Sequence, residues 1–297
     1  MTAPLVIYHA SCSDGFCAAW LFSKAFPDAD FHAAHYGTDP PETANDKDRP
    51  LYIVDFSYPR SAMFRLAALR HAEMVVLDHH KTAADVLDGL EIELAANNCG
   101  DALTARFDTT KSGGRLAWEY LYGSQHLSDE WLATNRFSYS SSVAPWLVDY
   151  TEDRDLWRWA LPDSREINAA LRSHPLDFAV WDSLHERYRS GRRELIAEGR
   201  AIFRREQQIV DDHLRHARDI VMDGHAVRAV NATVLFSEIA GELAKGRPFG
   251  ACYFDRWDGL RQWSLRSEAT GVDVSEVAKR RGGGGHRNAA GFEEKCS

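Results

Sequence analysis

Acidic and imidazole side chains gather at the ends of three short apolar runs, "LVIYH", "LYIVD" and "MVVLD". These side chains are His9, Asp14, Asp55, Asp78, His79 and His80. Converging carboxylates repel one another unless a cation lies among them. Carboxylate and imidazole ligands without paired thiolates suit manganese, iron or magnesium better than a structural zinc ion. The pattern predicts a metal centre that activates water, with two ions about 3.5–4 Å apart if both are present.

The apolar runs alternate with segments of helical pattern, which indicates how these side chains are positioned. Residues 15–26 and 61–71 have apolar side chains spaced by three and four, whereas the three runs read as buried strands. This alternation predicts parallel strands in an open α/β sheet. Ligands of such sheets bind beyond the carboxyl ends of the strands. We therefore expect the three strand ends to converge on one crevice.

A further acidic stretch, "VDYTEDRDLWRW", follows a helix-like segment and contains Asp149, Asp153 and Asp155. Any one of these carboxylates could complete a metal site. The alternative is that all three are surface residues at the end of a helix.

The C-terminal part carries residues suited to an anion. Four consecutive glycines, residues 282–285, are followed by His286 and Arg287, and Arg266 lies in the preceding "SLRS". Glycines let backbone N–H groups approach an anion without obstruction by a Cβ atom. The stretch predicts a phosphate-binding nest with a cationic edge, although glycines alone would indicate only a turn.

The order of patterns predicts two α/β domains. Residues 187–217 are charged and mostly helical in pattern, and they are followed by two hairpins and two short helices. We expect an N-terminal parallel-sheet domain at residues 1–190, a linker helix at 191–217 and a smaller C-terminal α/β domain at 218–297.

Composition indicates the cellular compartment and the class of binding partner. The 297 residues include five scattered cysteines without a C-x-x-C pair, and the formal charge is −9. The cysteines favour the reducing cytoplasm, and no apolar run approaches the roughly 18 residues of a membrane span. A net negative charge disfavours a long duplex nucleic acid as partner. A short phosphate compound held by metal and a few arginines fits the composition, and a homodimer is left open.

The combination of "DHH" after a strand, an upstream "H…DG", a lone aspartate ending the preceding strand and a late "GGGGH" resembles the DHH phosphoesterase superfamily with its DHH-associated C-terminal domain. The resemblance covers nearly the whole chain in the right order. It is similar to the branch that holds nanoRNase-type oligoribonucleases, RecJ-type exonucleases and cyclic-dinucleotide phosphodiesterases. The resemblance implies manganese as cofactor, as one or two ions.

The resemblance also assigns roles to residues. It implies metal ligands at His9, Asp14, Asp55, His79 and Asp153. Asp55 matches a residue that bridges two metals, and Asp153 is chosen because it precedes Trp157 by four residues. Asp149 and Asp155 stay open as the last ligand.

In the same way, His80 matches a histidine that contacts the scissile phosphate, and Asp78 would orient the two histidines. Substrate binding is implied for Arg266, Gly283, Gly284, Gly285 and His286. One departure is Cys12, which occupies the place of the family's first Asp-x-Asp aspartate. It is either a soft thiolate ligand, which would favour zinc, iron or cobalt, or a small buried residue.

The expected activity is a metal-dependent phosphodiesterase that hydrolyses dinucleotides, oligonucleotide ends or signalling nucleotides by attack of metal-bound hydroxide. The alternatives on the same fold are a phosphomonoesterase or exopolyphosphatase and a RecJ-like single-strand exonuclease. A further alternative is a nucleotide-binding protein that the Cys12 change has made inactive.

Overall fold

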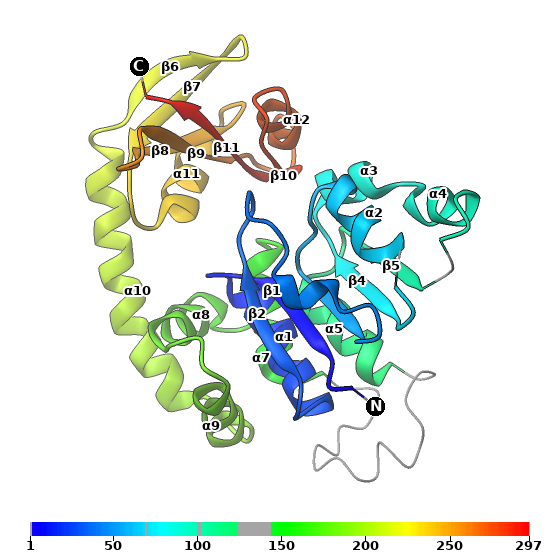
Figure 1. The fold of residues 1–297 in the computed structure, drawn as a ribbon. Coiled ribbons are helices and arrows are strands. Elements are labelled where there is room, and N and C mark those ends of the chain that lie inside the picture. The colour runs from blue at the N-terminus through cyan, green and yellow to red at the C-terminus, as the bar shows by residue number, and fades with distance from the viewer. Residues whose placement is uncertain (1, 69, 100–101, 124–143, 297) are drawn as a thin grey trace. The chain divides into compact units, whose positions relative to one another are not determined.

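The chain forms two compact units, Met1–Arg200 and Ala201–Ser297. The computed structural model describes residues 2–68, 70–99, 102–123 and 144–296, and Figure 1 shows its elements. Within these ranges, no helix combines the length and the apolar character that crossing a membrane requires.

The first unit is built on a sheet of five parallel strands in the order β2-β1-β3-β4-β5. The strands are β1 (Leu5–His9), β2 (Asp30–Ala34), β3 (Leu51–Val54), β4 (Met74–Asp78) and β5 (Leu103–Phe107). The three predicted strands are confirmed as β1, β3 and β4, at the centre of the sheet. The order reverses between β1 and β3, and such a switch point is where open α/β sheets bind ligands.

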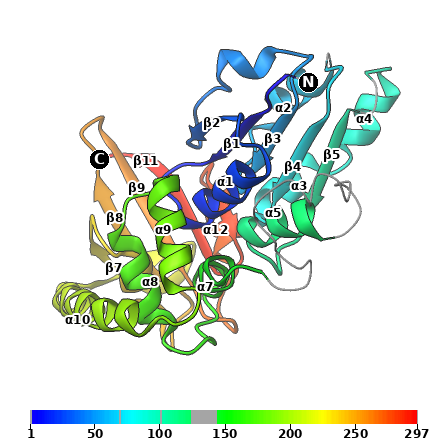
Figure 2. The ribbon, with the colours of Figure 1, turned by 90° about the horizontal axis from the view of Figure 1, so that it is seen from below.

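Helices cover both faces of this sheet, as Figure 2 shows. Alternate strand residues point to opposite faces, so Val6 joins one core while its neighbours Leu5 and Ile7 join the other. The first core contains α1 (Ser13–Ala25), α5 (Gly113–Tyr122), α7 (Trp146–Asp155), α8 (Ser164–Ser173) and α9 (Phe178–Tyr188). The second core contains α2 (Arg60–Ala68) and α4 (Leu90–Ala96). The remaining helices of this unit are the short α3 (Lys81–Leu87) and η1 (Glu42–Asn45).

The second unit is a six-stranded mixed sheet in the order β10-β11-β9-β8-β7-β6. Its strands are β6 (Arg218–Met222), β7 (His225–Asn231), β8 (Gly250–Asp255), β9 (Leu260–Arg266), β10 (Gly284–His286) and β11 (Ala289–Lys295). Helix α11 (Phe236–Ala244) packs in one apolar cluster of this unit and α12 (Val274–Lys279) in the other. Helix α10 (Arg193–Leu214) spans the boundary between the two units.

The predicted fold class is confirmed: a parallel-sheet domain, a smaller α/β domain and a long helix between them. The two predicted hairpins are β6–β7 and β8–β9, and the second turns at Asp258-Gly259.

Candidate metal centre

Asp55 follows β3 and lies at the centre of a buried polar cluster. Its residue surface is 1% exposed, and its backbone adopts a left-handed conformation with φ of 54°. Its N–H donates to the carbonyl of Leu77 at 2.8 Å. A Cβ atom on Gly113 would lie 2.4 Å from the Asp55 Cβ, so only glycine lets the start of α5 approach this closely. A left-handed non-glycine residue costs about 1–3 kcal/mol and often marks a functional site.

One side of the Asp55 carboxylate faces two imidazoles. His9 Nδ1, at the end of β1, lies 3.5 Å from Asp55 Oδ2. His9, Asp55 and His80 each place a ligand atom within 4.8 Å of the other two. We call these three residues the first ligand group. They come from the ends of β1, β3 and β4, as the parallel sheet predicts.

The other side of Asp55 faces a second set of side chains. His79 Nε2 lies 3.0 Å from Asp55 Oδ1, 3.6 Å from Asp14 Oδ2 and 3.5 Å from Asp155 Oδ2. Asp14, His79 and Asp155 form the second ligand group, again with ligand atoms within 4.8 Å of one another. The Asp55 carboxylate therefore lies between two ligand groups, which is the arrangement that a bridging ligand of two cations requires.

Asp14 is held by the first turn of α5. Its Oδ2 accepts a hydrogen bond from the N–H of Gly113 at 2.5 Å, and its Oδ1 accepts one from Gly114 at 2.9 Å. Helix N-termini stabilise negative charge. Burial and the carboxylates of Asp55 and Asp155 nevertheless raise the pKa of Asp14 well above its usual value. The sequence analysis did not identify these two glycines, which follow Ser112, the N-cap of α5.

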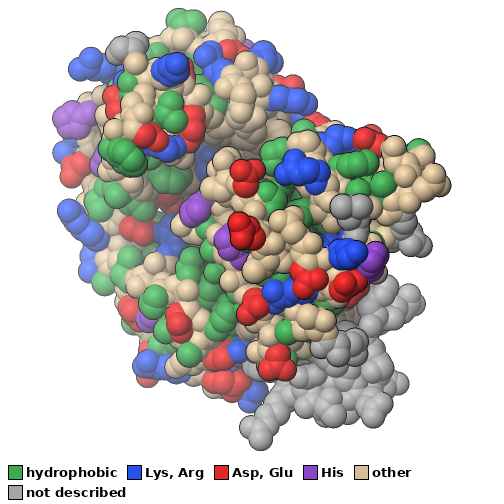
Figure 3. Space-filling view, viewed as in Figure 1, with side chains coloured by type: hydrophobic (Ala, Val, Ile, Leu, Met, Phe, Trp, Pro, Cys, Tyr) green, Lys and Arg blue, Asp and Glu red, His purple; other side chains and the backbone are tan. Residues whose placement is uncertain are grey.

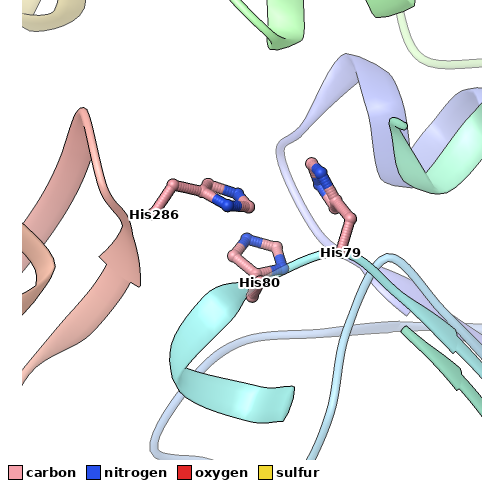
Figure 4. A group of neighbouring side chains, drawn as sticks. All are labelled: His79, His80 and His286. Atoms are coloured by element: carbon pink, nitrogen blue, oxygen red, sulfur yellow. The ribbon is translucent and has the colours of Figure 1, made fainter. Parts of the chain in front are cut away.

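Asp78 organises the two histidines that follow it. Its Oδ1 accepts hydrogen bonds from the His79 N–H at 2.7 Å, from the His80 N–H at 3.2 Å and from His80 Nδ1 at 2.7 Å. Its Oδ2 accepts one from the Ser57 hydroxyl at 2.7 Å. Burial alone would raise the pKa of Asp78, but the His80 imidazole and the Ser57 hydroxyl lower it to about 2. Figure 4 shows the His79 and His80 rings beside each other after β4, with His286 of the second unit also labelled.

The donor set of the cluster fits a divalent cation. Both carboxylate oxygens of Asp55 and Oδ2 of Asp155 are buried and accept no well-directed hydrogen bond from the described residues. Burial alone would lower the pKa of His79, but the Asp155 and Asp55 carboxylates raise it well above its usual value. A positive charge is therefore favoured beside the carboxylates of Asp14, Asp55 and Asp155, and a divalent cation would supply it. Carboxylate and imidazole ligands are those of manganese, iron and magnesium sites.

The structure does not bring Asp153, the residue chosen as last ligand, into either ligand group. Its carboxylate accepts hydrogen bonds from the N–H groups of Ala160 at 2.9 Å and Leu161 at 3.3 Å. Asp155 takes the place beside His79 instead. Side chains two residues apart on a helix point about 200° apart, so only one of this pair can face the cluster. Asp149 lies 2.5 Å from the guanidinium of Arg115.

Cys12 precedes α1 and belongs to neither ligand group among the described residues. Burial, followed by the carboxylates of Asp55 and Asp155, raises the pKa of its thiol well above the usual value. In the metal-free protein the neutral thiol is therefore favoured over a thiolate.

In the second unit, the structure brings two predicted substrate residues onto one sheet face. Arg266 pairs with Ala289, and Ala289 pairs with His286, in antiparallel ladders. Directly opposed residues of such ladders share a face. The Arg266 guanidinium donates to the Ser237 hydroxyl at 2.6 Å.

The glycine run has a structural role that the sequence did not indicate. The N–H of Gly283 donates to the carbonyl of Ala278 at 2.9 Å, so this N–H is paired within the second unit. Gly284 and Gly285 belong to β10, which pairs with β11. A Cβ on Gly283 would lie 2.1 Å from the carbonyl oxygen of Gly291. The close packing of these strands therefore requires glycine there.

Two curated relatives resemble the chain over most of its length. The oligoribonuclease NrnB of Bacillus subtilis strain 168 is 27% identical over 84% of this chain. An uncharacterized protein of Acanthamoeba polyphaga mimivirus is 26% identical over 97% of this chain. The chain spans 61% and 66% of the lengths of these relatives, respectively. No protein-family model matches the chain.

Solved structures share the fold. The structure of a DHH domain from a member of a family of ribosomal proteins has a TM-score of 0.50 and 14% identity, with 99% of this chain and 83% of that chain covered. The chain therefore shares the fold of that DHH domain. RecJ of Thermus thermophilus, solved with Mn²⁺, has a TM-score of 0.52 and 16% identity, with 97% of this chain and 49% of that chain covered. The "DHH" triplet of this chain is Asp78-His79-His80, after β4.

Proposed function

We propose that this protein is a divalent-metal-dependent phosphodiesterase of the DHH superfamily that hydrolyses short nucleotides. The observation that carries the proposal is the buried Asp55 carboxylate between two ligand groups. A phosphodiester is attacked by water and expels an oxygen, and a two-ion site can stabilise both of these oxygens.

The proposed ligands are the members of both groups except His80, which we assign to the phosphate. They are His9, Asp14, Asp55, His79 and Asp155, with Asp55 between the two positions. A bound divalent cation would lower the pKa of a water and neutralise charge on the phosphate. Asp14 is kept in place by the N-terminus of α5, and Asp78 keeps the His79 backbone in place. These contacts preorganise the ligands before a cation binds.

His80 is the proposed phosphate contact. The Nδ1 atom of His80 forms a hydrogen bond with Asp78. Burial alone would lower the pKa of His80, but the Asp78 carboxylate raises it above its usual value. A protonated imidazole would donate to a nonbridging oxygen as negative charge develops there. In the second unit we assign phosphate binding to Arg266, whose guanidinium the Ser237 hydroxyl orients, and to His286 on the same sheet face.

The proposed division of labour follows the two units. Met1–Arg200 would carry the catalytic metal centre and Ala201–Ser297 would bind substrate, with α10 as the connection. The proposed metal ligands all lie in the first unit, and Arg266 and His286 lie in the second.

Charge supports a short substrate. The formal charge is −9, and acidic and basic side chains are interspersed on the face shown in Figure 3. Proteins that hold long nucleic acids by their phosphates usually carry a basic stripe. The relative named an oligoribonuclease and the RecJ structure containing Mn²⁺ support short nucleotides as substrate and manganese as the cation.

The test is hydrolysis of a 5′-phosphorylated dinucleotide with manganese, with the products separated by chromatography. The wild type should release mononucleotides, and Asp55→Ala, which removes the bridging carboxylate, should release none. Inorganic polyphosphate and a phosphomonoester serve as competing substrates. An intact dinucleotide with manganese shown to be bound would refute the diesterase, and turnover of polyphosphate or monoester alone would replace it with that activity.

A further inference from the structure

Tyr36 is an exposed aromatic residue beside the first ligand group, and the proposed function gives it no role. It lies in the loop after β2, and 53% of its surface is exposed. Its ring centroid is 5.1 Å from that of His9 and 5.9 Å from that of His80, both in edge-to-face arrangements. A half-exposed ring therefore borders the proposed metal and phosphate site.

The backbone holds this ring in a defined place. The N–H and the hydroxyl of Thr38 both donate to the carbonyl of His35, at 3.3 and 2.7 Å. Gly37 has a φ of 83°, so residues 35–38 form a turn with a left-handed third residue and Tyr36 in second position. The N–H of Ala10 donates to the carbonyl of Ala34 at 2.8 Å, which ties the base of the loop to the end of β1.

Packing accounts for only part of the tyrosine ring. Its centroid is 4.9 Å from that of Phe56, which is 1% exposed, so Tyr36 helps to cover Phe56. A leucine could provide the same cover. The remaining half of the residue lies in solvent, where it contributes little to the stability of the fold.

The chemistry of an aromatic face indicates what would contact the exposed half. The face of the ring carries the negative part of its quadrupole, so it does not attract phosphate oxygens. A nucleobase, in contrast, stacks on such a face with little dependence on base identity. An aromatic residue next to a phosphate-handling centre is suited to the nucleoside attached to the phosphate.

We propose that Tyr36 stacks on the nucleobase of the nucleoside adjoining the scissile phosphate. The site would thereby select nucleoside-bearing phosphodiesters over inorganic polyphosphate and over sugar–phosphate chains without bases. The inference rests on the proposed function for its reaction, and it adds the residue that recognises the base.

The experiment compares a 5′-phosphorylated dinucleotide with two analogues in which one or the other residue is abasic. For the wild type, loss of the stacked base should raise KM by roughly 5- to 150-fold, the range expected for one base–aromatic stack. Tyr36→Phe should keep this preference, because the ring remains. Tyr36→Leu and Tyr36→Ala should turn over the normal and abasic substrates with similar KM and should leave kcat nearly unchanged.

Two controls separate stacking from damage to the site. Manganese affinity and melting temperature should match the wild type in Tyr36→Leu, because leucine still covers Phe56. Trp257→Ala removes a ring that is 98% exposed in the β8–β9 turn, and it should retain the full preference for bases.

Retention of the preference in Tyr36→Leu would overturn the inference. Equal losses in Tyr36→Phe and Tyr36→Ala would also overturn it, because they would assign the effect to the hydroxyl. Absence of turnover in the wild type would count against the proposed function instead. Titration calorimetry of the dinucleotide with the manganese-loaded protein would then test stacking by itself. A higher Kd for Tyr36→Leu than for the wild type would support the inference, and an unchanged Kd would oppose it.

Discussion

Asp155 and Asp153 lie two residues apart in α7, and the structure gives them opposite tasks. Asp155 Oδ2 lies 3.5 Å from His79 Nε2 inside the second ligand group, whereas Asp153 accepts backbone hydrogen bonds from Ala160 and Leu161. Asparagine is nearly isosteric with aspartate, but it is neutral and replaces one acceptor oxygen by an NH₂ donor. Exchanging each residue for asparagine therefore tests the assignment of the last ligand with minimal change in packing.

The two exchanges should affect different quantities: Asp155→Asn the affinity for Mn²⁺, and Asp153→Asn the melting temperature. A unit negative charge 4 Å from a divalent cation interacts with it by about 8 kcal/mol at an effective dielectric constant of 20. Desolvation offsets part of this gain, so Asp155→Asn should weaken Mn²⁺ binding by about a thousandfold or more. The metal-free variant should melt no lower than the wild type, because the partly exposed Asp155 carboxylate no longer repels the buried carboxylates of Asp14 and Asp55. Asp153→Asn can keep only one of the two backbone hydrogen bonds, because its NH₂ group cannot accept. Loss of a hydrogen bond worth about 1 kcal/mol corresponds to a melting temperature lower by about 2–4 °C for a unit of this size.

The assay measures Mn²⁺ affinity by titration calorimetry and melting temperature by scanning calorimetry with excess chelator. Asp153→Asn should bind Mn²⁺ as the wild type does. The opposite pattern, in which Asp153→Asn loses the metal and Asp155→Asn keeps it, would refute the assignment of Asp155. Loss of binding in neither variant would refute the role of α7 in the metal centre.

Three further predictions concern the support of the site and the stability of the first unit. Gly113→Ala should weaken Mn²⁺ binding and lower the free energy of unfolding by about 1–3 kcal/mol, because its Cβ would lie 2.4 Å from the Cβ of Asp55. Titration calorimetry and urea unfolding measure these two effects. The control Gly191→Ala, where a Cβ would meet open space, should change neither quantity. Ser237→Ala should raise KM for the dinucleotide without changing Mn²⁺ affinity, because Arg266 loses the hydroxyl that orients it; an unchanged KM would argue against Arg266 as a substrate contact. Burial lowers the pKa of His185, so the folded state binds a proton there less readily than the unfolded chain does. The free energy of unfolding, measured with urea, should therefore be highest above the pKa of the unfolded chain and fall as the pH drops below it. If His185→Gln shows the same pH dependence as the wild type, His185 is not its cause.

The sequence determined the central strands and the residues at their ends. Runs such as "LVIYH" and "MVVLD" are apolar throughout because both faces of a central parallel strand are buried. Polar residues directly after such runs lie together at one sheet edge, so the convergence of His9, Asp55 and His79 could be predicted. The edge strands β2 and β5 carried no such signal, because exposed and buried residues are mixed in them.

Only the tertiary structure decided which groups complete the site. Asp153 and Asp155 have the same chemistry, and the orientation of α7 alone determines which carboxylate faces His79. Gly113 matters because α5 begins against Asp55, a contact between residues 58 positions apart in sequence. Local patterns report periodicity and residue type, which are properties of short segments. Close approaches between distant segments depend on how helices pack on the sheet, and this packing places the proposed ligands around the central carboxylate.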